Sequence, residues 1–142
     1  FSQEHIHIIQ QFAKEQGYML HALCWKHDWC DDFIEVNSAQ GLQNAFDQAD
    51  FCITSTFHGT IFSLLHHRPF AAFAAPLRTE KVQRLLADFG LQDCFWEEKR
   101  LDKIQSNVEY SVFDATLEDK RKESLKYLQQ AIDCAQTTRK GK

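Results

Sequence analysis

The sequence lacks the features that mark several large classes of protein. No apolar run approaches the roughly eighteen residues that span a bilayer, and the amino-terminal residues do not have a signal-peptide layout. Neither common nucleotide fingerprint, GxGxxG or GxxxxGK(S/T), is present. The net charge of −4 and the lack of a basic stripe argue against a nucleic-acid partner.

The number and positions of the cysteines and the scarcity of methionine each carry an expectation. The five cysteines are an odd number at irregular positions, so we expect reduced thiols in a cytoplasmic protein. The only methionine is Met19, and the chain opens at Phe1 inside a pattern typical of a helix. We therefore expect a piece of a longer protein, preceded by an N-terminal domain that holds part of the active site.

What is present is the composition of an ordinary globular domain. The 142 residues are 44% hydrophobic and 25% charged, which suffices for one domain with a real core. Short apolar runs without alternation predict buried strands at Tyr18–Trp25, Phe33–Val36, Phe51–Thr54 and Phe70–Ala75. Helical spacing predicts helices from Ile6 to a stop at Gly17, over 38–48, 58–67 and 79–89, and over about 114–136.

Strands and helices alternate along the chain, and this order predicts the fold class. We expect an α/β domain, a Rossmann-like parallel sheet with helices on both faces, over residues 1–142. Ligands of such sheets bind at the carboxyl ends of the strands. Here those ends are the loop over residues 25–32, the turn over residues 55–60 and the loop over residues 76–81.

The turn over residues 55–60 is the richest of these strand ends. Ser55, Thr56 and Thr60 supply hydroxyls, His58 supplies an imidazole, and Gly59 lets a ligand approach the backbone. A helix beginning here favours an anion such as phosphate or carboxylate. The imidazole can hydrogen-bond that anion or act as general acid or base. The alternative is that Thr56 merely caps the helix and His58 bonds nearby backbone.

Two further groups of residues are weaker candidates. Arg78 and Lys81 could neutralise an anion bound over the turn, or could simply lie at a solvated helix start. The spacing C-x2-H-x2-C lies in the loop over residues 24–30, but a fourth metal ligand is missing, so no metal site is expected. The two tryptophans between these residues indicate packing or a surface for stacking on sugars.

The segment ADFCITSTFHGTIFSLLHHRPFAAF, followed by a basic residue and VQRLLADFGL, resembles the C-terminal part of the polysaccharide pyruvyltransferase family. The resemblance implies the C-terminal domain of a two-domain fold like that of GT-B glycosyltransferases. It implies transfer of a pyruvyl group from phosphoenolpyruvate to a sugar as a ketal, in exopolysaccharide biosynthesis, without a further cofactor.

The resemblance also implies roles for individual residues. The family's His-Gly pair corresponds to His58 and Gly59, which places the imidazole at the donor pyruvyl or phosphate. The basic residue of the later helix corresponds best to Lys81, with Arg78 as a substitute. Many members carry arginine where this chain has Thr56.

Two other functions remain open at this point. A glycosyltransferase of the same architecture would use a sugar nucleotide as donor. A non-catalytic module would bind a glycan or a partner through the loop that carries Trp25 and Trp29.

Overall fold

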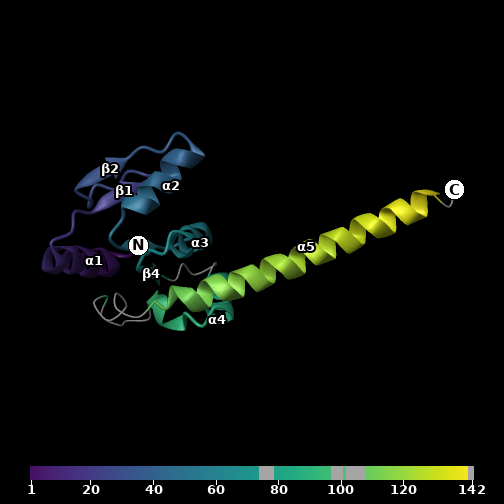
Figure 1. Ribbon diagram of the computed structural model, residues 1–142. Coiled ribbons are helices and arrows are strands. Elements are labelled where there is room, and N and C mark those ends of the chain that lie inside the picture. Colours follow the sequence, from purple (N-terminus) through teal and green to yellow (C-terminus); the bar gives the residue numbers. More distant parts are fainter. Residues whose placement is uncertain (74–78, 97–100, 102–107, 141–142) are drawn as a thin grey trace. The chain divides into compact units, whose positions relative to one another are not determined.

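The computed structural model describes residues 1–73, 79–96, 101 and 108–140, in two compact units, Phe1–Val108 and Glu109–Lys142 (Figure 1). The first unit contains α1 (Gln3–Gln16), β1 (His21–Leu23), β2 (Asp32–Ile34), α2 (Ala39–Gln48), β3 (Cys52–Thr54), α3 (Phe57–Leu65), β4 (Phe70–Phe73), α4 (Thr79–Asp88), a short 3-10 turn (Gln92–Cys94) and β5 (Phe95–Trp96). The second unit contains one helix, α5 (Tyr110–Lys140), which spans the range expected for the last helix. Over the described residues, no helix combines the length and apolarity that a membrane span requires.

The strands of the first unit form two parallel sheets. One sheet pairs β1 with β2, and in the other β4 lies between β3 and β5. Parallel strands flanked by helices confirm the expected α/β class, but the single expected sheet is divided in two. Local apolar patterns identify strands without specifying which strands pair, because pairing depends on contacts between distant segments.

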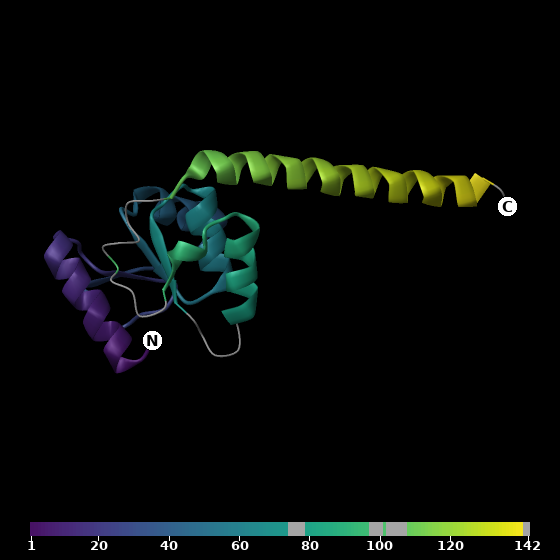
Figure 2. The ribbon, with the colours of Figure 1, turned by 90° about the horizontal axis from the view of Figure 1, so that it is seen from below.

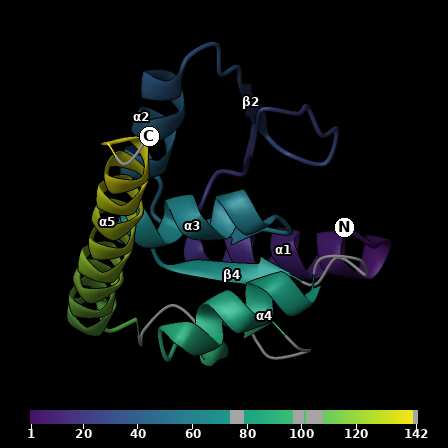
Figure 3. The same cartoon turned by 90° about the vertical axis from the view of Figure 1, so that its right-hand side faces the viewer.

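The three-stranded sheet lies between layers of helix. Ala71 and Phe73 of β4 are buried in one cluster with Ile9 and Phe12 of α1. Ala72 is also buried and points to the opposite face, because successive side chains of a strand alternate between faces. α3 and α4 cover that opposite face, as Figures 2 and 3 show. With both faces covered, the carboxyl edge of this sheet remains the place for a ligand.

Local sequence signals set the ends of the flanking helices. Ser2 caps α1 by accepting the backbone N–H of His5 at 3.1 Å, and Gly17 ends α1 with a left-handed φ of 71°. Ser38 caps α2 in the same way by accepting the N–H of Gly41 at 3.0 Å. These caps satisfy N–H groups that have no partner within the helix. The stop at Gly17 and the cap of α2 at Ser38 agree with the sequence, whereas α1 begins three residues before the expected Ile6, because Ser2 supplies a cap that was not predicted from the sequence.

Candidate functional site

The turn between β3 and α3 is built around a capping threonine. Thr56 has an extended backbone, and its hydroxyl accepts the N–H of Gly59 at 3.0 Å. Its carbonyl oxygen accepts both the N–H and the hydroxyl of Thr60, at 3.1 and 3.0 Å. The capping role weighed for Thr56 from the sequence is therefore present, and α3 begins at Phe57.

A second threonine, Thr54 at the end of β3, holds this cap in place. Its hydroxyl accepts the backbone N–H of Thr56 at 3.1 Å and lies 3.3 Å from the hydroxyl of Thr56. A Cβ on Gly59 would overlap the hydroxyl oxygen of Thr54 and would lie 2.9 Å from its Cβ. Gly59 thus makes room for Thr54, which gives this glycine a packing role; close approach of a ligand to Gly59 stays a prediction.

Several donors at this turn have no hydrogen-bond partner among the described residues. In the described part of the chain, no hydrogen bond involves the backbone N–H of Phe57, the backbone N–H of His58 or the hydroxyl of Ser55. The His58 side chain is exposed, and its ring contacts only Phe57 among the described aromatic residues. Free N–H groups at a helix start, beside a hydroxyl and an imidazole, form a site suited to an anion.

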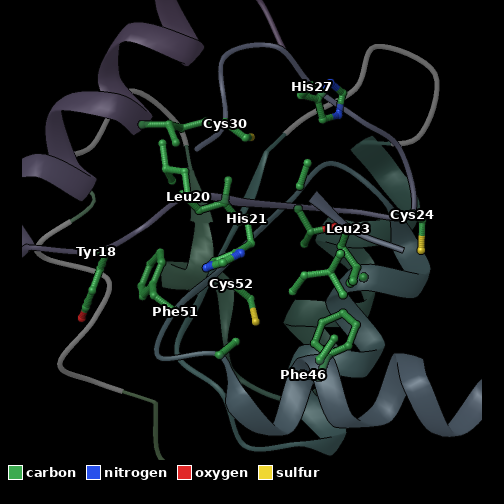
Figure 4. Close-up of a pocket in the computed structure, with 18 of the residues that line it drawn as sticks. Tyr18, Leu20, His21, Leu23, Cys24, His27, Cys30, Phe46, Phe51 and Cys52 are labelled. Atoms are coloured by element: carbon green, nitrogen blue, oxygen red, sulfur yellow. The ribbon is translucent and has the colours of Figure 1, made fainter. Parts of the chain in front are cut away.

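The turn opens onto a cavity of about 740 Å³ in the first unit. Ser55, Thr56, His58 and Gly59 line it, together with residues of α1, α2, β1 and β3 and of the loop after β1. Figure 4 shows side chains from β1, β3, α2 and this loop around the space. The volume falls within the usual range for small-molecule sites, about 300–1,000 Å³.

The cavity occupies a position that the topology favours for ligands. Every residue of β1 and of β3 lines it, so it lies between a strand of one sheet and a strand of the other. The segments after β1 and after β3 both follow the carboxyl ends of parallel strands. In open α/β sheets, ligands bind outside these carboxyl ends, at the point where the direction of winding changes.

Some of the expected site residues line the cavity and others do not. It brings Ser55, Thr56, His58 and Gly59 together on one cavity wall. Thr60 is fully buried, with its hydroxyl engaged inside the helix. The remaining two residues are cations: Lys81 is exposed in the first turn of α4 and does not line the cavity, and Arg78 lies outside the described residues. Ligand binding by these residues stays a prediction.

Two of the cavity-lining residues that sequence reasoning missed are Thr54 and His21. Thr54 appeared only as the last residue of a strand, although the pattern Thr-x-Thr before a helix is a signal for hydroxyl-to-backbone bonding. His21 appeared only as part of an apolar run, yet it lines the cavity with its Nδ1 3.7 Å from an oxygen of Asp32. A histidine inside an apolar strand pattern is the signal that could have identified it.

The three residues of the C-x2-H-x2-C spacing, Cys24, His27 and Cys30, all line the cavity. Within the described ranges, no three His, Cys, Asp or Glu side chains converge in a way that could hold a metal ion. Burial, with a smaller contribution from the charge of Asp31, raises the pKa of the Cys30 thiol. That shift disfavours the thiolate that metal binding requires.

The comparison with known families gives one result. The model of a family described as polysaccharide pyruvyl transferase matches residues 2–75. The match begins with α1 and includes the loop after β1 and the turn after β3, so it covers both the cavity and His58. Neither a curated protein nor a solved structure matches the chain significantly.

Proposed function

The chain belongs to the polysaccharide pyruvyl transferase family, and on this premise we propose that it transfers a pyruvyl group from phosphoenolpyruvate to a saccharide as a ketal. The observation that carries the proposal is the set of donors at the start of α3 that have no hydrogen-bond partner among the described residues; two of the residues that supply them, Ser55 and His58, line the cavity. Phosphoenolpyruvate carries a phosphate and a carboxylate, and both are anions of the kind that such a helix start binds.

The proposed reaction makes and breaks a small number of bonds. Two hydroxyl oxygens of the saccharide form bonds to the central carbon of phosphoenolpyruvate, and the bond from that carbon to the phosphate oxygen breaks. One hydroxyl proton goes to the methylene carbon, which becomes a methyl group, and the other leaves with the phosphate. Transfer of these protons is the chemistry that a positioned general acid or base accelerates.

In this proposal, the backbone N–H groups of Phe57 and His58 and the hydroxyl of Ser55 bind the anionic groups of the donor. The exposed imidazole of His58 then lies at the donor, where it binds the phosphate or moves a proton of the saccharide hydroxyl. The neighbouring hydroxyl of Thr56 already accepts a bond from Gly59, so its part is to hold the turn. Arg78 and Lys81 remain the proposed cations of this chain.

We also propose that a second domain completes the site. In the described part of the chain, no lysine or arginine lines the cavity, whereas the donor brings several negative charges. The side chains of His58 and Trp25 are both exposed, and the reaction requires that water be excluded from the donor. On this account the complete gene product is active and residues 1–142 alone are not.

Thermal unfolding of the complete gene product with different ligands tests the donor. Phosphoenolpyruvate at about one hundred times its Kd stabilises the protein by about 2.7 kcal/mol, and a nucleotide sugar at the same concentration has no effect. Stabilisation by nucleotide sugars alone would instead favour the glycosyltransferase. The paired activity assay adds phosphoenolpyruvate and a saccharide and detects release of phosphate together with the ketal methyl group by NMR.

A further inference from the structure

The loop between β1 and β2, residues 24–31, carries three ring side chains on the cavity wall. Trp25, His27 and Trp29 all line the cavity. Trp25 is 77% exposed, the largest exposed fraction of any large hydrophobic side chain in the described residues. An indole left in water forgoes the burial of about 150–250 Å² that such a side chain can contribute, so folding does not account for its position.

Hydrogen bonds and a ring contact hold the rest of the loop, so its rings form a preorganised surface. The carbonyl oxygen of Trp29 accepts the side-chain amide of Gln10 at 3.1 Å. The ring of His27 stacks on that of Trp29, with centroids 5.4 Å apart and an angle of 29°. At the base of the loop, the carboxylate of Asp31 accepts the N–H of Leu20 at 2.8 Å. Trp25 has no ring contact or hydrogen bond in the described part of the chain, so its indole is open to a ligand.

The lining of the cavity indicates the chemistry of that ligand. In addition to the indole of Trp25, the imidazoles of His21 and His27 line the cavity, and imidazoles can hydrogen-bond neutral hydroxyl groups. A nucleotide would stack equally well, but no described lysine or arginine lines the cavity to bind its phosphates; Lys26 of the same loop is exposed and is not among the lining residues. A saccharide ring presents an apolar face of C–H groups and an edge of neutral hydroxyls, so it matches both features.

We propose that the loop over residues 24–31 is the acceptor subsite, where Trp25 stacks on a sugar ring while His27 and His21 contact its hydroxyls. The assignment of this sugar as acceptor rests on the proposed function; the binding of a saccharide does not. The same cavity holds Ser55 and His58, so a sugar on this loop shares one space with a donor at the start of α3. The two substrates thus occupy the segments that follow β1 and β3.

The test compares Trp25→Ala with a matched control in the complete gene product. Tyr127→Ala is the control, because Tyr127 is an aromatic residue that is 71% exposed and lies on α5, outside the set of cavity residues. The probes are the methyl glycosides of glucose, galactose and mannose in both anomeric forms. Binding is measured by calorimetry without phosphoenolpyruvate, and the KM of each substrate is measured in the transfer assay.

We expect Trp25→Ala to weaken binding of the preferred glycoside by about five- to tenfold, as the loss of one aromatic contact of about 1 kcal/mol implies. Its KM for that glycoside rises by a similar factor and its KM for phosphoenolpyruvate is unchanged, while Trp25→Phe restores most of the affinity. Tyr127→Ala behaves as the wild type.

Three results would overturn the assignment. These are wild-type affinity in Trp25→Ala, an equal rise of both KM values, or no binding of any glycoside by the wild type. A failure of the proposed function would look different. In that case glycosides bind and their affinity depends on Trp25, but no pyruvyl group is transferred.

Discussion

The turn after β3 and the loop after β1 face one cavity, yet they are built in opposite ways. In the turn, Thr54, Thr56 and Gly59 are joined by hydrogen bonds and by a contact that tolerates only glycine. In the loop, the base is hydrogen-bonded, and Trp25 extends into solvent without a ring contact among the described residues.

This difference matches what we propose that each segment binds. Backbone N–H groups hold an anion only when the backbone itself is fixed, because their direction is set by the chain. An aromatic ring binds through its face and tolerates different positions of a sugar on it. On the proposed function, the rigid turn suits one small donor, and the loop suits an acceptor that forms part of a larger saccharide.

The largest expected effect comes from removing the imidazole at the turn. We expect His58→Ala to lower kcat for transfer from phosphoenolpyruvate by about 10²–10⁴-fold, the usual contribution of a positioned acid or base. His58→Gln separates the two roles. If His58 only binds the donor, this variant changes KM and keeps kcat; if His58 moves a proton, kcat falls as well. His7→Ala, an exposed histidine of α1 outside the cavity, is the control and keeps wild-type kinetics. Equal rates in the two alanine variants would remove His58 from the reaction.

The next effect is on stability and concerns Gly59. We expect Gly59→Ala to lower the free energy of unfolding by about 1–3 kcal/mol, because its methyl group meets Thr54 in a packed turn. Gly41→Ala is a matched control, since Gly41 is the third residue of α2 and its N–H is likewise accepted by the capping residue. Its new Cβ would lie 3.2 Å from a side-chain hydroxyl alone, so the change stays within about 1 kcal/mol. Equal losses measured by denaturant titration would show that Thr54 does not constrain the turn.

A smaller effect is expected from the cap itself. Thr56→Ala removes the acceptor for the N–H of Gly59 and should destabilise the protein by about 1 kcal/mol. Thr56→Ser keeps the hydroxyl and should retain most of that stability. The free energy of unfolding and the KM for phosphoenolpyruvate are measured together, because a loosened turn weakens donor binding as well. A serine variant as unstable as the alanine variant would mean that the methyl group, and not the cap, stabilises the turn.

The rates at which the thiols are labelled report the contrast between the two regions. Cys24 in the loop is exposed, whereas Cys52 in β3 is buried, and burial raises the pKa of its thiol above the ordinary value of 9.0. Because that raised pKa keeps Cys52 protonated as pH rises towards 9, N-ethylmaleimide should modify Cys24 first at every pH below 9. Mass spectrometry of the labelled peptides measures this order. Labelling of Cys52 as fast as that of Cys24 would show that β3 is open to solvent.

A third thiol gives a dependence of stability on pH. Burial, with a smaller contribution from Asp93, raises the pKa of Cys94 to about 12. The folded state then holds this proton more tightly than the unfolded state, whose thiol has the ordinary value of 9.0. The contribution is present below pH 9 and is lost as pH rises towards 12, at up to about 1.4 kcal/mol per pH unit. Cys94→Ala should flatten that part of the curve, and an unchanged slope would contradict the assignment.

Local patterns were sufficient for the turn and for most elements, but not for the short strand β5, and they were insufficient for everything that depends on distant contacts. The end of α1 at Gly17 and the cap of α2 at Ser38 follow from residue type alone. The strand expected over Tyr18–Trp25 shortens to His21–Leu23, because apolar character marks burial and not hydrogen-bonded pairing. The division into two sheets, the contact between Gly59 and Thr54 and the shared cavity arise from packing between segments, which one sequence does not reveal.

The most direct test of the central claim follows the backbone amides of the turn by ¹H–¹⁵N NMR as phosphoenolpyruvate is added. The account predicts saturable shifts of the Phe57 and His58 amides, whose N–H groups make no hydrogen bond to any described residue, and a smaller shift at Gly59, whose N–H is held by Thr56. His58→Ala should weaken the binding that these shifts report. Saturable shifts confined to residues outside the turn, or no shifts in the complete gene product, would contradict the assignment of this turn as the donor site.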